Sequence, residues 1–300
     1  MKLAQKLFSL SLLCRCLVPL LAAFSLHADS PSKNETGVMS PAQAGRVFLS
    51  NAQNFIASDA NTTTDLDGRV ITADFADGNF RVQHRFQESG RKLSWEVLTG
   101  KQKGAKGTVD SQVFEVRPGI YFIMTQPASH EAVSLVIDEN RGVASGFLSR
   151  YFDKDRDRLV SLTRIHGPVL EAEAAGDGSG QLNEADLGGT RFTVVYPGEV
   201  AIYEHIYLNQ HYMTWLGHKG TSAGVADTER YEAIEVAPLL YLVAWNEKSA
   251  PLQISMLFDF ARMSERATIF GFDEANKRTV YQTTSAKIRK ISHTRIPGLK

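Results

Sequence analysis

The chain has 300 residues, 33 basic against 33 acidic side chains, and 43% hydrophobic residues. This length suits two domains of about 100–150 residues each, and the apolar fraction is that of a globular protein. The formal net charge of zero predicts no basic surface for nucleic acid. Both cysteines, Cys14 and Cys16, lie near the N-terminus, which excludes a disulfide framework, a Cys-ligated metal site and a thiol nucleophile from the rest of the chain.

Residues 1–28 have the pattern of a secretory signal peptide. Two lysines give a positive start, an apolar stretch follows at Cys16–Phe24, and Ala28 offers a small residue for cleavage. Because Arg15 interrupts the apolar run, the stretch is much shorter than the roughly 20 residues of a membrane-spanning helix. We therefore expect a secreted or periplasmic protein with no membrane span after signal removal.

Residues 29–61 predict a polar lead-in and a short helix. The helix is expected at Pro41–Ala57, where Ser40 can cap the first turn and apolar residues recur at helical spacing. The polar residues before it predict a flexible connection to the folded domains.

The remaining sequence repeats itself with an offset of 120 residues. The offset pairs Trp95 with Trp215 and Tyr121 with Tyr241. A constant offset kept across such rare residues indicates two homologous domains. Further matched pairs are Gly68 and Gly188, Gly100 and Gly220, Gly104 and Gly224, Thr108 and Thr228, Glu115 and Glu235, Val116 and Val236, and Pro118 and Pro238.

We place an N-terminal domain at 62–165, a linker of small and acidic residues at 166–185, and a C-terminal domain at 186–292. Both domains have the alternation of apolar and polar residues that is typical of strands, with turn residues between them. About eight strands fit in each repeat, the number that closes a small barrel. The sequence therefore predicts an all-β fold of two tandem antiparallel barrels. The clearest strand segments are 80–87, 92–100, 119–126, 132–139, 191–198, 201–208, 211–217, 239–247 and 252–260.

Several of these segments resemble the MoaF family, which is associated with molybdenum cofactor biosynthesis. The resemblance covers about 62–275 and implies two tandem calycin barrels related to the lipocalins. It implies no catalytic residue. The segments that carry it include LSWEVLTG (93–100), VSLVIDENRGVASG (133–146), YEHIYLN (203–209), GVADTERY (224–231) and LYLVAWNEK (240–248).

The densest polar cluster is the strand segment YEHIY. Tyr203, His205 and Tyr207 share one face of the strand, and Glu204 lies on the other. An imidazole and a carboxylate beside two phenols suit general acid–base catalysis on a small phenolic or carbonyl substrate, so these four are the candidate catalytic residues. The alternative is a barrel interior filled by aromatic side chains whose polar tips satisfy one another.

Five further residues are candidates for ligand binding. Tyr212 and Trp215 lie on opposite faces of the next strand, and Trp245 lies on a later one. Asp227 and Arg230 are close enough in sequence to form either a binding pair or a structural ion pair. The alternative for Trp215 is a core position that closes one barrel end.

A metal site is the weaker hypothesis. Glu204, His205, His211 and His218 are close in sequence, and their oxygen and nitrogen atoms suit zinc. Glu204 and His205, however, point to opposite faces of one strand, and His218 is expected in a solvated turn. We therefore predict no metal. The sequence also lacks a phosphate loop, a dinucleotide fingerprint and a nucleophile elbow, so we predict no cofactor.

Two functions fit these observations. The first is an exported small-molecule-binding protein whose pocket in the second barrel takes a small apolar or aromatic ligand. The second is a cofactor-free enzyme, a lyase or isomerase that dehydrates, decarboxylates or isomerises a small organic substrate in the same cavity. An enzyme needs an acid and a base that converge on one spot, so geometry distinguishes the two.

The signal peptide is directly testable. We expect the protein recovered from the periplasm of an expressing bacterium to begin after Ala28, because the segment before it has the features that signal peptidases recognise. Intact-mass measurement checks this, and a periplasmic mass that starts at Met1 contradicts it.

Overall fold

The computed structural model describes residues 62–75, 79–151, 160–171, 182–248, 251–273 and 278–294. All of these residues belong to one compact unit of the chain. The expected signal peptide and the expected helix at 41–57 lie outside the described residues. Within the described ranges, no helix has the length and apolar character needed to cross a membrane.

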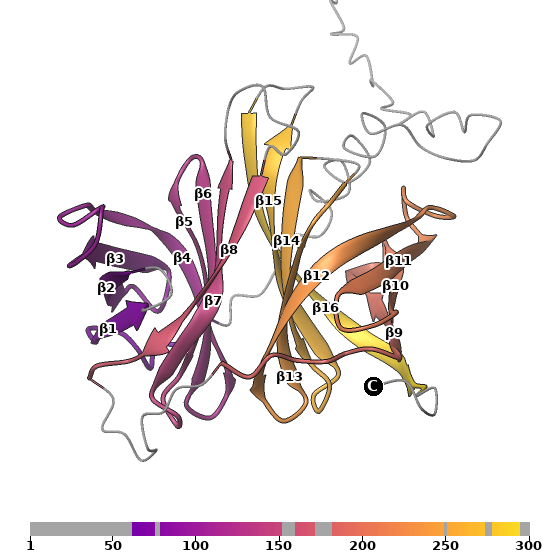
Figure 1. The fold of residues 1–300 in the computed structure, drawn as a ribbon, viewed down its shortest axis with the longest axis horizontal. Helices are drawn as coiled ribbons and strands as arrows, with labels where there is room; N and C mark the ends of the chain where they lie inside the picture. Colours follow the sequence, from indigo (N-terminus) through magenta and orange to yellow (C-terminus); the bar gives the residue numbers. More distant parts are fainter. Residues whose placement is uncertain are drawn as a thin grey trace, which may run out of the picture. The chain divides into compact units, whose positions relative to one another are not determined.

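The first eight strands form one antiparallel sheet in which each strand pairs with its neighbours in the chain (Figure 1). A bridge between Ala73 and Val169 brings its first and last strands together. Gly167 permits this approach, because a Cβ there would lie 1.8 Å from the Asp74 carbonyl oxygen. The strands are β1 (Val70–Phe75), β2 (Phe80–Gln87), β3 (Lys92–Val97), β4 (Lys106–Arg117), β5 (Ile120–Ala128), β6 (Glu131–Asp138), β7 (Val143–Tyr151) and β8 (Val160–Pro168).

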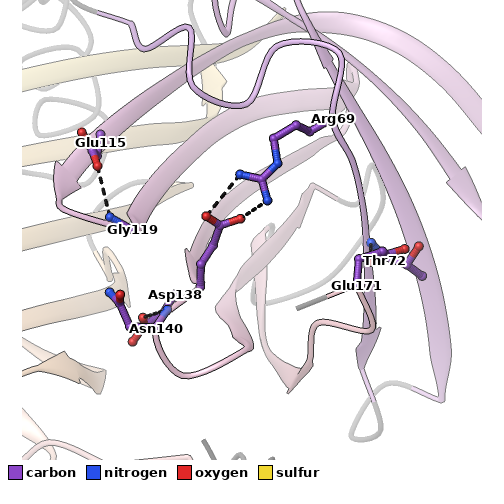
Figure 2. A network of polar contacts seen from close by, with 8 residues as sticks. Arg69, Thr72, Glu115, Gly119, Asp138, Asn140 and Glu171 are labelled. Carbon is purple, nitrogen blue, oxygen red and sulfur yellow. Dashed lines mark hydrogen bonds and ion pairs between the residues drawn. The ribbon is translucent and has the colours of Figure 1, made fainter. Parts of the chain in front are cut away.

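Polar contacts link segments of the first barrel that are far apart in sequence (Figure 2). Glu171, just after β8, accepts a hydrogen bond from the Thr72 N–H of β1 at 2.5 Å. Arg69, just before β1, forms an ion pair with Glu139, which follows β6. The first contact therefore helps to hold β1 against the end of the sheet, and the second ties the start of β1 to the end of β6.

The second eight strands form a closed barrel, in which β9 pairs with both β10 and β16 (Figure 1). The predicted all-β fold of two antiparallel barrels is therefore confirmed. A short 3-10 turn, η2 (Pro197–Glu199), joins the first two strands. The strands are β9 (Thr190–Val195), β10 (Ile202–Tyr207), β11 (Tyr212–Lys219), β12 (Ala226–Ala237), β13 (Leu240–Asn246), β14 (Leu252–Asp259), β15 (Ser264–Asp273) and β16 (Arg278–His293).

Strands at the same place in the two barrels are related by the repeat. β1 and β9 have the same bounds after a shift of 120 residues, and so do β4 and β12. Trp95 and Trp215 lie on the third strand of each barrel, and Tyr121 and Tyr241 lie on the fifth. The offset visible in the rare residues is thus the offset between equivalent strands.

Each barrel has its own apolar interior, and a third apolar cluster contains side chains of both barrels. Phe122 of β5 and Leu242 of β13 belong to this third cluster, whereas Ile123 and Val243 next to them face the two interiors. Strands buried on both faces are apolar throughout rather than alternating. This explains the nearly continuous apolar runs in GIYFIMTQ and LLYLVAWNE.

A bidentate ion pair accompanies the third cluster. Arg117 donates from Nε and Nη2 to the two carboxylate oxygens of Asp259, at 3.1 and 2.8 Å, and from Nη1 to the Pro238 carbonyl oxygen. Burial raises the pKa of Asp259, but hydrogen bonds from Arg117 and from the Arg262 N–H outweigh it, so the net pKa is lowered. The pair therefore keeps a buried carboxylate charged between the two barrels.

We expect Arg117→Met to lower the free energy of unfolding by about 3 kcal/mol, because it leaves the buried Asp259 carboxylate without its partner. Denaturant unfolding measures this loss. Lys92→Met is the control, since Lys92 pairs with Asp110, whose side chain is 89% exposed, and its stability should stay close to that of the parent. Equal stability of the two variants contradicts the prediction.

Candidate functional site

Strand β10 divides the candidate catalytic residues between the two faces of the second barrel. Tyr203 and Tyr207 belong to the apolar interior, and His205 lies between them with 2% of its surface exposed. The His205 ring stacks on Phe192, with 5.3 Å between ring centroids. Glu204 points to the outer face. The structure thus brings together the imidazole and the two phenols, as the alternation predicts, without Glu204.

Glu204 links three strands on that outer face. It forms an ion pair with Arg191 of β9, and its Oε2 lies 2.9 Å from Nε2 of His218 on β11. The hydrogen bond from Arg191 is the main cause of its lowered pKa. Because His205 lies inside the barrel, Glu204, His205 and His218 do not converge. Among the residues with described positions, no three His, Cys, Asp or Glu side chains gather in a way that suits a metal ion.

The candidate ligand-binding residues are also divided. Trp215 and Trp245 lie in the interior, whereas Tyr212 and Arg230 are exposed. Asp227 is half-buried and pairs with Nζ of Lys248 at 3.2 Å rather than with Arg230. The two tryptophans therefore lie in the same interior as His205, and the expected Asp227–Arg230 pair does not form.

A small cavity lies inside the second barrel, with a volume of about 30 Å³. This is about the volume of one water molecule, far below the roughly 300 Å³ or more of a pocket for a drug-sized ligand. Its polar and aromatic lining consists of Tyr196, Tyr203, His205, Trp215, Trp245 and Glu247. An organic ligand enters only if side chains move, and Met256 in the wall is the most adaptable of them.

A pair of buried carboxyl groups lies at the Glu247 side of this cavity. The pairing of Tyr231 with Trp245 places Glu229 of β12 opposite Glu247, and the two carboxyls are hydrogen-bonded. Trp245 Nε1–H donates to Oε1 of Glu247 at 2.8 Å, and the Lys248 N–H donates to Oε1 of Glu229 at 3.1 Å. A side-chain hydrogen bond from Trp215 also reaches Glu247 and acts to lower its pKa.

Burial sets the protonation of these groups. It is the main reason that the pKa of Glu229 is raised to about 7 and that of Glu247 to about 8, and repulsion from Glu229 contributes to the value for Glu247. It lowers the pKa of His205 to about 4. At neutral pH the imidazole is therefore neutral, and Glu247 holds a proton for most of the time.

Sequence reasoning missed both carboxyls. Glu229 and Glu247 lie in segments already singled out, and Glu229 shares a strand face with Asp227 and Tyr231. That alternation was the available signal for Glu229. The contact with Glu247 depends on how β12 and β13 pair, which the sequence does not display.

The first barrel repeats the histidine but not the carboxyls. His84 is paired across the sheet with Trp95, as His205 is with Trp215. Both histidines have a pKa of about 4, chiefly through burial. A hydrogen bond to the Ile71 backbone holds the His84 ring.

At the positions that match Glu229 and Trp245, 120 residues earlier, the first barrel has Val109 and Thr125. The carboxyl pair, and the wall of the cavity that Trp245 forms, are thus found in the second barrel and not in the first.

Comparisons with known proteins agree with this two-barrel organisation. The model of the MoaF N-terminal domain matches residues 51–153, and that of the MoaF C-terminal domain matches residues 182–294. Protein MoaF of Klebsiella aerogenes is 39% identical over 70 residues, which are 23% of this chain and 27% of that protein. The match thus spans about a quarter of that relative.

One solved structure is also similar in part. A crystal structure from Burkholderia vietnamiensis, described as a candidate beta-lactamase, is 21% identical and covers 36% of this chain and 95% of its own. Its TM-score is 0.30, so it carries no argument about fold or activity.

Glu265 gives a testable pH dependence. It lies 1% exposed in the second barrel with no hydrogen-bond partner for either oxygen, and burial raises its pKa from 4.5 to about 8. The folded state therefore binds this proton more tightly, and the free energy of unfolding falls as the pH rises from 4.5 to 8. His84 and His205 act in the opposite direction, but only between pH 4 and 6.5.

We expect the melting temperature to fall between pH 6.5 and 8, and Glu265→Gln to reduce this fall. One carboxyl accounts for at most about 1.4 kcal/mol per pH unit. Thermal unfolding at several pH values measures the slope. Glu199→Gln, on the outer surface, is the control and should keep the full slope. A parent protein whose melting temperature is constant over this range contradicts the prediction.

Proposed function

Since this chain belongs to the MoaF family and has its polar cavity in the second barrel, we propose that it is an exported protein that binds a small molecule inside that barrel. One observation carries the proposal. Nδ1 of His205 is buried against the cavity and has no hydrogen-bond partner. The Tyr207 hydroxyl, two residues along the same strand face, also has none.

Such groups lower the stability of a protein. A buried donor or acceptor without a partner costs about 1–3 kcal/mol. In the first barrel the equivalent histidine, His84, also has an unpartnered Nδ1, but a hydrogen bond to the Ile71 backbone holds its ring. His205 instead packs against the rings of Phe192, Trp245 and Phe258. A ligand with a polar group would supply the missing partner, which is why we assign the cavity to binding.

The walls of the cavity indicate the kind of ligand. Trp215, Trp245, Tyr203 and Tyr196 present aromatic surfaces, and Ile254 and other aliphatic side chains complete the lining. Such a lining favours a small apolar or aromatic molecule that a few polar groups orient. The small volume means that binding is coupled to movement of the wall, and the expected cost of that movement is an affinity below that of a preformed pocket.

A second function, catalysis without a cofactor, is favoured by one further observation. Glu247 and His205 line the same cavity, with pKa values of about 8 and 4. Between these values a protonated acid and a neutral base coexist, which is the condition for general acid–base catalysis. A lyase or isomerase acting on a small organic substrate in this cavity is therefore the alternative proposal.

Benzyl alcohol, a small aromatic molecule with one hydroxyl, is a suitable probe. Two of the three tryptophans line the cavity, so we expect the probe to shift the indole N–H resonances of Trp215 and Trp245 but not that of Trp95. His205→Phe should weaken binding at least about fivefold, since it removes one hydrogen bond worth about 1 kcal/mol or more and narrows the cavity. Its melting temperature should not fall, because no protein partner is left unpaired.

His84→Phe is the matched control. It makes the same change opposite the equivalent tryptophan of the first barrel and should leave the affinity for benzyl alcohol unchanged. A folded His205→Phe protein that binds the probe as tightly as the parent contradicts the proposal.

A further inference from the structure

The polar side of the cavity is acidic. Glu247 is part of the lining, Glu229 is hydrogen-bonded to it, and Asp227 follows on the same face of β12. The basic side chain of Lys248 is 61% exposed and is paired with Asp227. Within the described part of the chain, no lysine or arginine lines the cavity. Three carboxyl groups therefore face this region with one exposed ammonium group to balance them.

The aromatic side of the cavity also favours positive charge. Trp215 and Trp245 line it together with Tyr203 and Tyr196. The faces of tryptophan and tyrosine rings attract cations, most strongly when both partners are shielded from water. His205, buried in the same lining with an unpartnered nitrogen, adds an acceptor for an N–H group. Carboxyl groups, aromatic side chains and an unpartnered imidazole nitrogen thus surround one small space.

We propose that the second barrel binds an organic ammonium ion, with the charged head group held in the cavity between the Glu247 carboxylate and the rings of Trp215 and Trp245. The inference rests on the proposed binding function and specifies its ligand class. A protonated amine offers up to three N–H donors, and this lining offers Glu247 oxygens and the His205 nitrogen as acceptors. A ligand carboxylate would instead lie against other carboxyl groups.

The volume of the cavity suits such a head group. A cavity of about 30 Å³ matches a water molecule, and an –NH3+ group is of similar size. The rest of the ligand then needs room along the apolar wall, where Met256, Ile254 and Ile269 lie. Met256 has the flexibility to make that room. Ligand entry therefore displaces aliphatic side chains, while the head-group site already exists.

Binding of a cation competes with protons on the carboxyl pair. Glu229 and Glu247 have pKa values of about 7 and 8, and a cation beside them favours their ionised forms. Affinity for an amine should therefore increase as the pH rises through 7 and 8, with release of a proton.

The other groups that face the pair do not titrate in this range. His205 is neutral above its pKa of about 4, and Tyr196 has a pKa raised well above its ordinary value by burial. Asp227 and Lys248 form an ion pair with each other at the exposed side.

Benzylamine, benzyl alcohol and benzoate test the ligand class, because they have the same ring and differ in the charge of the head group. Titrations of the protein are followed by the indole N–H resonances of Trp215 and Trp245. At pH 8 we expect benzylamine to bind at least tenfold more tightly than benzyl alcohol, and benzoate to bind least. The preference for benzylamine should weaken as the pH is lowered through 7.

Glu247→Gln should abolish both the preference and its pH dependence. Glu265→Gln is the matched control, since it removes another buried carboxyl of the same barrel that does not line the cavity, and it should keep both. Melting temperatures establish that each variant is folded. If Glu247→Gln does not fold, the preference of the parent protein for benzylamine and the pH dependence of that preference test the ammonium assignment.

The outcomes separate the two proposals. If benzyl alcohol binds at least as tightly as benzylamine, the ammonium assignment is overturned and the binding function stands. If none of the three compounds shifts the tryptophan resonances, the binding function itself fails. A folded Glu247→Gln protein that keeps the preference for benzylamine overturns the assignment of the head-group site to this carboxyl.

Discussion

In a closed barrel of eight strands, every second side chain of each strand points into one shared interior that excludes bulk water. A polar group placed there must find a partner or take up its neutral form. In the second barrel this constraint acts on His205, Glu247 and Glu265. Burial lowers the pKa of the imidazole to about 4 and raises those of the two carboxyls to about 8. The chemistry available to the cavity follows from this exclusion of water, because the same side chains on the outer face would have ordinary charges.

The two barrels have the same arrangement of strands and differ in their interior side chains. Each places a histidine opposite the tryptophan of its third strand, yet Val109 stands in the first barrel where Glu229 stands in the second. The first interior is accordingly apolar and its histidine is held by the backbone. The outer faces of β4–β7 contribute apolar side chains to the cluster shared by both barrels. This arrangement suits a division in which the first barrel supports the second and the second holds the ligand.

The parts of the structure that follow from local alternation could be predicted from the sequence, and the parts that depend on strand pairing could not. Nine strands were predicted from their apolar and β-branched segments, and the inward face of Tyr203, His205 and Tyr207 followed from alternation. Strands with polar, half-exposed sequences, such as KGTVDSQVFEVR and ADTERYEAIEVA, gave no such signal. His205 faces Trp215 as His84 faces Trp95, so the two histidines are equivalent in the structure. They are 121 residues apart (205 − 84 = 121), whereas the offset of the sequence repeat is 120 and matches Glu204 with His84.

Glu204 and Glu247 show why proximity in sequence is a poor guide to this site. Glu204 is next to His205 in the chain, but it faces outward, and Arg191 and His218 keep its pKa low. Glu247 is 42 residues away (247 − 205 = 42), yet it lines the same cavity as the imidazole. The turn after β13 sets its position, because the Lys248 N–H binds Glu229 while the Lys248 ammonium binds Asp227. One residue at the rim thus connects an exposed ion pair to a buried carboxyl pair, so a change in that turn alters charge at the rim and protonation inside the barrel together.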